Sequence, residues 1–186
     1  AGPITVKGLQ FNSVQADKAI VQALQLAGCS IKQENDAVAV EPSTLFAFQF
    51  NATDCPDLFP PLAVLAAYCK GTSIIEGVHR LTHKESNRAE ALQQELGKMG
   101  VQIEIEKNNM KIQGSNTLKG AHLFSHNDHR IAMAGAVAAL KAKGTTVIEY
   151  ADVIKKSYPS FYAHLQQLGA LLEIVEENNS TLQSKP

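Results

Sequence analysis

The sequence has few cysteines, no excess of positive charge and no long apolar run, and each of these absences excludes a class of function. Its three cysteines, Cys29, Cys55 and Cys69, are odd in number and lack the spacing of metal ligands. We therefore predict reduced thiols and a cytoplasmic location. A formal net charge of -1 excludes a basic footprint for nucleic acid or an anionic membrane surface. No apolar run approaches the ~18 residues that a membrane-spanning helix needs.

The chain does have enough apolar material for a sizeable core. Hydrophobic residues make up 45% of its 186 residues. A chain of this length and composition is most simply one domain, so we predict a single domain over residues 1–186.

An internal repeat of about 70 residues organises the sequence. Segments 15–42, 85–114 and 157–179 share one plan, in which an amphipathic helix ends at a glycine and a short strand follows. The helix-ending glycines are Gly28, Gly100 and Gly169, and the strands are 30–32, 101–105 and 171–175. The first two copies are expected to turn at 35–36 and 108–109 and to return in a second strand. The third copy reaches 178–179 and stops.

A second layer of repetition lies between these units. Segments 50–71 and 124–144 each run from a strand end through a polar loop into an apolar helix. The helices at 62–67 and 131–140 lack a polar face, so we expect them to be buried. Similar strands follow at 72–76 and 145–149, and a matching strand opens the chain at 4–8. The unit is roughly β-α-β-β-β-α, with two complete copies and a truncated third. The predicted fold class is therefore α/β (α+β), with a pseudo-threefold arrangement of the units.

The stretch 127–134 carries the clearest chemical signal. It places Asp128, His129 and Arg130 immediately before a helix of small apolar residues. A helix N-terminus already favours anions, because its backbone N–H groups are unpaired and its dipole is positive there. The added imidazole and guanidinium predict a phosphate or carboxylate ligand. A capping Asp128 with an exposed Arg130 is the alternative explanation.

Charged residues recur at equivalent corners of the repeat. Asp57 and Arg130 precede the glycines that end their helices by the same number of residues, and basic residues occur in 83–88 and 155–159. If the units pack around a pseudo-threefold axis, these corners converge on one end of the domain. The predicted result is a cationic pocket that holds two anions and moves protons between them. Its cations are Lys84, Arg88, Arg130 and Lys156, and its carboxylates are Asp57 and Glu85.

Each motif taken alone has a simpler structural explanation. The Lys-Glu-x-x-Arg string is typical of a solvated first helical turn. Lys155 and Lys156 fit a surface pair, and Asp57 fits an N-cap before a proline-rich helix. Four such coincidences at repeat-related corners are much less probable than any one of them, which favours the pocket.

Four motifs together resemble the C-terminal half of the 5-enolpyruvylshikimate-3-phosphate (EPSP) synthase family. They are Asp-Cys-Pro-Asp at 54–57, His-Lys-Glu-Ser-Asn-Arg at 83–88, Asn-Asp-His-Arg-Ile-Ala-Met at 127–133 and Lys-Ser-Tyr-Pro at 156–159. Their order and spacing match over residues 4–170. The resemblance implies transfer of the enolpyruvyl group of phosphoenolpyruvate to the 5-hydroxyl of shikimate 3-phosphate, with release of phosphate. It implies no metal and no organic cofactor.

Family members have two similar globules, each built from three β-α-β-α-β-β units, with the active site in the cleft between them. They are more than twice as long as this chain. The resemblance therefore implies that this chain is one globule, inactive alone, and that its partner is the missing N-terminal globule of the same enzyme.

The resemblance also implies a role for each matching residue. Asp57 matches the carboxylate that contacts the 5-hydroxyl and is the favoured general base, and Lys84 contacts the same substrate. Glu85 matches the acid that delivers a proton to the methylene carbon of phosphoenolpyruvate. The residues that match phosphoenolpyruvate-binding groups are Arg88, Arg130 and Lys156, with His129 as a neighbouring donor.

Three positions depart from the family pattern, and two other functions stay open. Asn87 stands where the family often has Asp, Thr82 where it has Arg or Lys, and Arg80 where some members have Asn. One alternative is an enolpyruvyl transferase acting on a UDP-sugar, whose motifs differ around 127–133. The other is a stand-alone globule that binds phosphorylated metabolites without catalysis.

Overall fold

The computed structural model of the chain describes residues 2–82, 84–115 and 117–175. His83 and the predicted end of the third repeat at 178–179 lie outside these residues. The strands are β1 (Ile4–Val6), β2 (Ser30–Glu34), β3 (Ala37–Glu41), β4 (Gln49–Asn51), β5 (Thr72–Glu76), β6 (Gln102–Glu106), β7 (Asn109–Gln113), β8 (His122–Phe124) and β9 (Val147–Glu149). The helices are α1 (Ile20–Leu26), α2 (Phe59–Ala67), α3 (Arg88–Lys98), α4 (His129–Ala139) and α5 (Phe161–Gln167).

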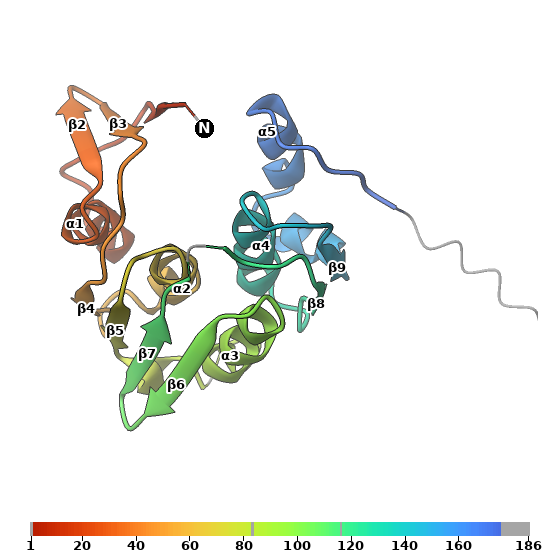
Figure 1. Cartoon of the computed structure of the whole chain (residues 1–186). Helices are drawn as coiled ribbons and strands as arrows, with labels where there is room; N and C mark the ends of the chain where they lie inside the picture. The colour runs from red at the N-terminus through yellow and green to blue at the C-terminus, as the bar shows by residue number, and fades with distance from the viewer. Residues whose placement is uncertain (1, 83, 116, 176–186) are drawn as a thin grey trace, which may run out of the picture.

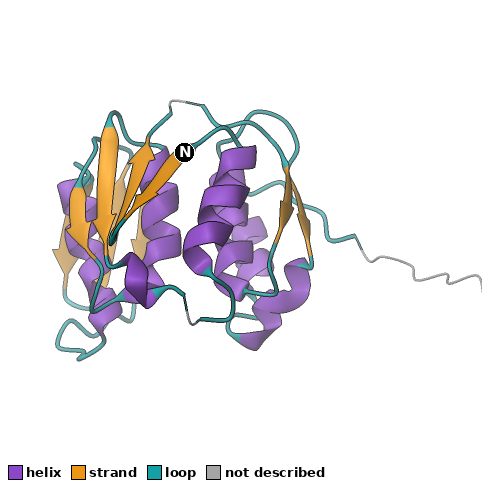
Figure 2. Ribbon diagram, turned by 90° about the horizontal axis from the view of Figure 1, so that it is seen from below, coloured by secondary structure: helices purple, strands orange, loops and turns teal. Residues whose placement is uncertain are grey.

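The strands form three small sheets around central helices (Figure 1). One sheet has the antiparallel order β1-β3-β2, and a second has the order β4-β5-β7-β6, in which only β4 and β5 are parallel. The third is the parallel pair β8-β9. In Figure 2 this pair lies on one side of the molecule and the other strands lie on the opposite side, with helices between them. The mixed α/β class is confirmed.

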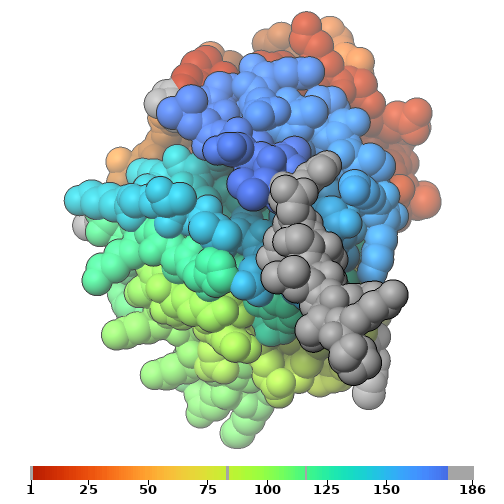
Figure 3. All heavy atoms as spheres, turned by 90° about the vertical axis from the view of Figure 1, so that its right-hand side faces the viewer, coloured from red at the N-terminus to blue at the C-terminus, as the bar shows by residue number. Residues whose placement is uncertain are grey.

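Two kinds of unit recur in the order of elements. A helix joins the parallel strands β4 and β5, and another joins β8 and β9. A second kind of unit, strand-helix-hairpin, is built by β1, α1, β2 and β3, and again by β5, α3, β6 and β7. After β9 and α5 no hairpin follows in residues up to 175. Figure 3 shows the face on which β8, β9 and α5 lie together, coloured cyan to blue.

The two apolar helices α2 and α4 contribute much of the buried core, as predicted. Pro60 lies in the first turn of α2, where its missing N–H costs nothing, and Phe59, Leu62 and Ala63 are 0% exposed. In α4 the residues facing the core are small, which lets α2 and α3 pack closely against it. One face of α4 is less covered, because Val137 is 40% exposed.

The helix-ending glycines adopt the backbone conformation that their position requires. Gly28, Gly100 and Gly169 have φ angles of 85°, 92° and 92°, which confirms the predicted left-handed helix ends. The turn between β6 and β7 differs slightly from the prediction. It is centred on Lys107, with φ 55°, and on 108, so β7 already begins at Asn109.

The strand predicted at 171–175 is wrong. These residues form no strand, and Leu171 and Val175 are 103% and 78% exposed. A strand is stabilised by hydrogen bonds to a neighbour, and none of the described residues supplies a pairing partner here. No helix in residues 2–175, as far as they are described, is long and apolar enough to cross a membrane.

Candidate anion-binding active site

Arg88 is the centre of a cluster of charged side chains. It is the first residue of α3, and its side chain is only 1% exposed. Its three guanidinium nitrogens donate to three carboxylates: Nη1 to Asp57 Oδ1 at 2.8 Å, Nη2 to Glu85 Oε2 at 2.5 Å and Nε to Asp128 Oδ2 at 2.8 Å. Burial opposes the charge of Arg88, but the bonds to these carboxylates outweigh it and raise the pKa of the guanidinium. Arg88 therefore holds three chain segments at one point.

Asp57 lies in the 3-10 turn Pro56–Leu58 that leads into α2. It accepts from Lys84 Nζ at 3.2 Å, from Arg88 Nη1, and from Arg130 Nη2 at 2.9 Å. Partial burial would raise the pKa of Asp57, but the charge of Arg130 and the bonds from Lys84 and Arg88 hold it below its usual value. Its side chain is 32% exposed, so this carboxylate is both ionised and open to a ligand.

Asp128 joins the cluster to the N-terminus of α4. It is 0% exposed, and its Oδ1 accepts from the backbone N–H of Arg130 at 2.9 Å, which makes it the N-cap of α4. Its Oδ2 accepts from Arg88 Nε and from Ser86 Oγ at 3.1 Å. Burial alone would raise the pKa of Asp128, and the bonds and charge of Arg88 lower it below its usual value.

His129 and Glu85 face each other beside this cluster. His129 Nδ1 lies 3.9 Å from Glu85 Oε1, beyond hydrogen-bond distance, and has no partner among the described residues. A buried nitrogen without a partner is costly, and within the described residues this atom is the one unsatisfied buried polar side-chain group at the cluster. The Glu85 side chain is 43% exposed, which leaves its other oxygen accessible while Arg88 holds Oε2.

Lys156 lies at the edge of the cluster rather than inside it. It ends the 3-10 helix Ala151–Lys156, and its Nζ lies 3.5 Å from the carbonyl oxygen of Asn127. That contact places an exposed ammonium next to the loop before α4. The structure gives Lys156 no direct contact with Asp57 or Glu85 within the part of the chain that it describes.

The three positions that depart from the family pattern have local contacts. Arg80 Nη1 donates to the carbonyl oxygen of Thr53 at 2.9 Å, three residues before the turn of Asp57. Thr82 Oγ1 donates to the carbonyl oxygen of His79 at 3.4 Å. The side chain of Asn87 is the N-cap of α3, where Asp serves equally well.

The structure brings together most of the predicted site, and it rejects the simpler explanations of two motifs. Arg88 is buried, so its motif is not a solvated helical turn. Asp57 accepts from three side-chain cations instead of capping α2, although Asp128 does cap α4. The sequence analysis missed Asp128 and Ser86 as members of the cluster. Their signal was present, because both stand inside the motifs that carry Arg88 and Arg130.

The positive and negative charges of the cluster balance, and two of its cations pair with a carboxylate that an anionic ligand would replace. Lys84 and Arg130 neutralise Asp57, and both are 28% exposed. A phosphate or carboxylate that entered here would compete with Asp57 for these two groups. A guanidinium fork binds either anion in two-pronged fashion, which an ammonium does not.

Solved structures share this fold. Two structures of EPSP synthase from Acinetobacter baumannii superpose with TM-scores of 0.85 and 0.83 at 23% and 21% identity. Each match covers 94% of this chain, and 44% and 43% of the solved chains. The chain therefore has the fold of one part of an EPSP synthase.

The sequence comparisons take this one step further. The family model for EPSP synthase (3-phosphoshikimate 1-carboxyvinyltransferase) matches residues 1–184, so the chain belongs to that family. Proteins named 3-phosphoshikimate 1-carboxyvinyltransferase from Methanocella arvoryzae and Clostridium kluyveri are 43% and 38% identical over 173 and 170 residues. These matches cover 92% and 91% of this chain. The chain spans 40% of the length of each of these relatives.

Proposed function

We propose that this chain, as one domain over residues 1–186, is one globule of a cytoplasmic EPSP synthase. The complete enzyme would transfer the enolpyruvyl group of phosphoenolpyruvate to the 5-hydroxyl of shikimate 3-phosphate. The observation that carries this proposal is the convergence of Asp57, Lys84, Glu85 and Arg130 around the buried Arg88, in a chain that matches the family over residues 1–184. Free Cys29, Cys55 and Cys69 agree with a reducing compartment.

The geometry supports a distinct role for each of the two exposed carboxylates. Asp57 is the proposed general base for the 5-hydroxyl, and its lowered pKa keeps it ionised at neutral pH. When Arg130 turns to phosphoenolpyruvate, Asp57 loses a cation and becomes more basic, so binding and proton removal are coupled. Glu85 is the proposed acid that protonates the methylene carbon. The new C–O bond then forms at the adjacent carbon, and expulsion of phosphate with loss of a methyl proton restores the enol ether.

The cations complete the proposed site. Three groups lie at the start of α4, where the helix dipole also favours an anion: Arg130, Lys156 and the Nδ1 of His129, which has no partner among the described residues. Lys84 is the proposed contact to shikimate 3-phosphate. Arg88 is the third cation proposed to bind phosphoenolpyruvate, and its bonds to three carboxylates support an orienting role as well.

The proposed partner is the rest of the same enzyme, and an apolar cavity supports this. A cavity of about 680 Å³ separates α1, α2, α4 and α5, with Leu24, Val64, Met133 and Phe161 among its lining residues. Val6 of β1 and Ile75 of β5 occupy similar positions, each two residues before a glycine with a left-handed backbone. Helix α2 packs against β5, and Ile75 is 0% exposed, whereas Val6 is 50% exposed. Open apolar surface of this extent is typical of an interface.

A chimera tests the proposed activity. This chain would replace the matching 170 residues of the Clostridium kluyveri relative, and phosphate release from shikimate 3-phosphate plus phosphoenolpyruvate would be measured. We expect activity from the chimera, loss of more than about 100-fold with Asp57→Ala, and no release from the chain alone. A folded chimera without activity would contradict the proposed function. Release by the isolated chain, abolished by Asp57→Ala, would contradict its being half an enzyme.

The second candidate is binding of phosphorylated metabolites without catalysis. The partly exposed Lys84 and Arg130 support it, since an ammonium and a guanidinium both bind phosphate. An inactive chimera combined with phosphoenolpyruvate binding by the isolated chain would establish this alternative. A UDP-sugar substrate is not favoured, since the matching family model and the relatives described above are those of EPSP synthase.

A further inference from the structure

Glu95 is a buried carboxylate outside the cluster described above. It lies in α3, two helical turns after Arg88, and its side chain is 4% exposed. It accepts from the backbone N–H of Phe124 at 2.9 Å, from His126 Nε2 at 2.8 Å and from Lys98 Nζ at 2.7 Å. Burial would raise the pKa of Glu95, but these donors lower it, so the group is ionised at neutral pH. Two of its donors belong to the segment that leads into the site.

That segment has an unfavourable backbone conformation. His126 and Asn127 are consecutive non-glycine residues in the left-handed region, with φ angles of 53° and 54°. A left-handed backbone is unfavourable for residues other than glycine and persists where the surroundings fix it. Ser125 fixes one end, because its Oγ accepts from the N–H of Asn127 at 3.3 Å and its carbonyl accepts from the N–H of Asp128 at 2.9 Å. Glu95 fixes the other end through Phe124 and the ring of His126.

The left-handed pair decides where the groups of the site lie. The carbonyl of Asn127 accepts from Lys156. The next residue, Asp128, is the N-cap of α4, and His129 and Arg130 are the first two residues of that helix. Helix α3 therefore holds this loop at two points, through Arg88 at Asp128 and through Glu95 at His126. With two points fixed, the loop has one orientation relative to α3 and hence to Asp57.

We infer that Glu95, acting through His126, is a positioning residue that holds residues 126–130 in the anion-binding arrangement. This inference rests on the proposed function for the nature of the ligand, but not for the conformation of the loop. Glu95 itself touches no ligand. Its effect is to offset the strain at His126 and Asn127, so that Arg130, His129 and Lys156 face one ligand at the same time.

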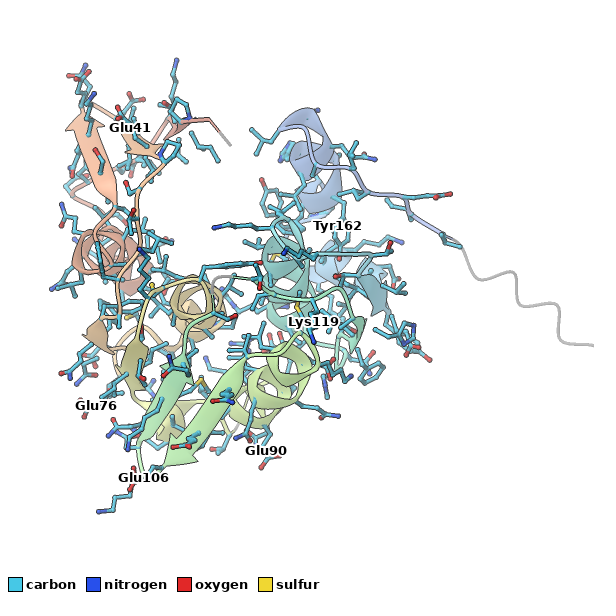
Figure 4. All side chains as sticks on the ribbon, in the orientation of Figure 1. Glu41, Glu76, Glu90, Glu106, Lys119 and Tyr162 are labelled. Atoms are coloured by element: carbon cyan, nitrogen blue, oxygen red, sulfur yellow. The ribbon has the colours of Figure 1, made fainter. Side chains whose placement is uncertain are left out.

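The first test compares Glu95→Ala with Glu90→Ala. Glu90 is an exposed carboxylate on the same helix, and Figure 4 shows it at the outer edge of the molecule, so it is a matched control. Binding of phosphoenolpyruvate and of inorganic phosphate would be followed by NMR at the amide signals of His129 and Arg130. We expect roughly tenfold weaker binding for Glu95→Ala, because misplacement of binding groups by about 1 Å has effects of this size or larger. Glu90→Ala should bind like the original chain.

The second test is a rescue that general destabilisation does not predict. In the Glu95→Ala background His126 has lost its carboxylate partner, so His126→Gly gives up the edge-on ring contact with Phe124 but relieves the left-handed strain. The double variant should reverse at least half of the increase in log Kd that Glu95→Ala causes. In the original background, His126→Gly should weaken binding, because it removes the bond that joins Glu95 to the His126 ring. Loss of affinity in the double variant equal to the sum of the two single losses would overturn the inference.

A third measurement does not depend on any ligand. Hydrogen exchange of the Asn127 and Asp128 amides should accelerate about tenfold or more in Glu95→Ala, while core amides such as that of Ile112 stay protected. Unchanged exchange at Asn127 and Asp128 would overturn the positioning role even if neither anion binds. Absence of anion binding by the original chain would instead contradict the anion-site part of the proposed function. The two failures are therefore distinguishable.

Discussion

Arg88 Nε lies 2.8 Å from Asp128 Oδ2, and the two side chains are 1% and 0% exposed. This pair connects the N-termini of α3 and α4, so two helices present their positive ends toward one cluster. Because both charges are buried away from water, each is compensated by the other. The pair therefore controls both the stability of the fold and the geometry of the site.

Removal of Asp128 should be strongly destabilising. Asp128→Ala leaves Arg88 buried with one fewer carboxylate and removes the N-cap of α4. We expect the free energy of unfolding to fall by about 3–5 kcal/mol, as measured by urea denaturation. Asp152→Ala is the control, since it breaks an exposed pair with Lys155 at 3.8 Å and should change stability by less than about 0.5 kcal/mol. Equal effects of the two variants would contradict this account of the buried pair.

Acid should destabilise the fold through its hydrogen-bonded carboxylates. The folded-state pKa values of Asp57, Glu95 and Asp128 are all lower than their ordinary values. A group with a lowered pKa contributes stability above its unfolded-state pKa of about 4, and that contribution is lost as pH falls toward the folded-state value. We therefore expect stability to be nearly constant from pH 7 to 5 and to fall below about pH 4.5. Urea midpoints across this range, with Glu95→Gln showing a shallower fall, would check it.

Arg130→Lys should separate anion binding from stability. The Arg130 side chain is 28% exposed, so its replacement should change the free energy of unfolding by less than about 1 kcal/mol. A lysine cannot bind a phosphate or carboxylate in two-pronged fashion. We expect Kd for phosphoenolpyruvate to rise roughly tenfold, which corresponds to ~1.4 kcal/mol. Calorimetric titration measures it, and Arg80→Lys with unchanged affinity is the control.

The apolar cavity should accept a helix placed ahead of β1. A copy of residues 129–144 joined directly before Pro3 would repeat the order α4-Gly144-β9 that the chain itself shows. Burial of a few side chains against Val64 and Met133 should raise the free energy of unfolding by ~2 kcal/mol or more. The same copy with Asp at the positions of Ile131, Ala134 and Ala138 is the control. No gain, or an equal gain from the Asp version, would mean that the cavity has another occupant.

The sequence alone was sufficient for features that depend on near neighbours. Glycines that end helices, the apolar character of α2 and α4, and the two hairpins follow from local conformational preference and spacing. The motif at 127–133 places its charged groups at a helix N-terminus, as the structure has them, and the anion site there stays a prediction. A strand at 171–175 failed for the opposite reason, since a strand also needs a partner.

The tertiary structure decided which charged groups meet and what each one does. Asp57 and Arg130 are 73 residues apart in sequence, and only the packing of α2 against α4 brings them to 2.9 Å. Glu95 stands among the polar residues of an amphipathic helix, yet the fold buries it and brings it to 2.8 Å from His126. Spacing along a chain determines local conformation, whereas the partners of a buried charge are set by segments that meet only after folding.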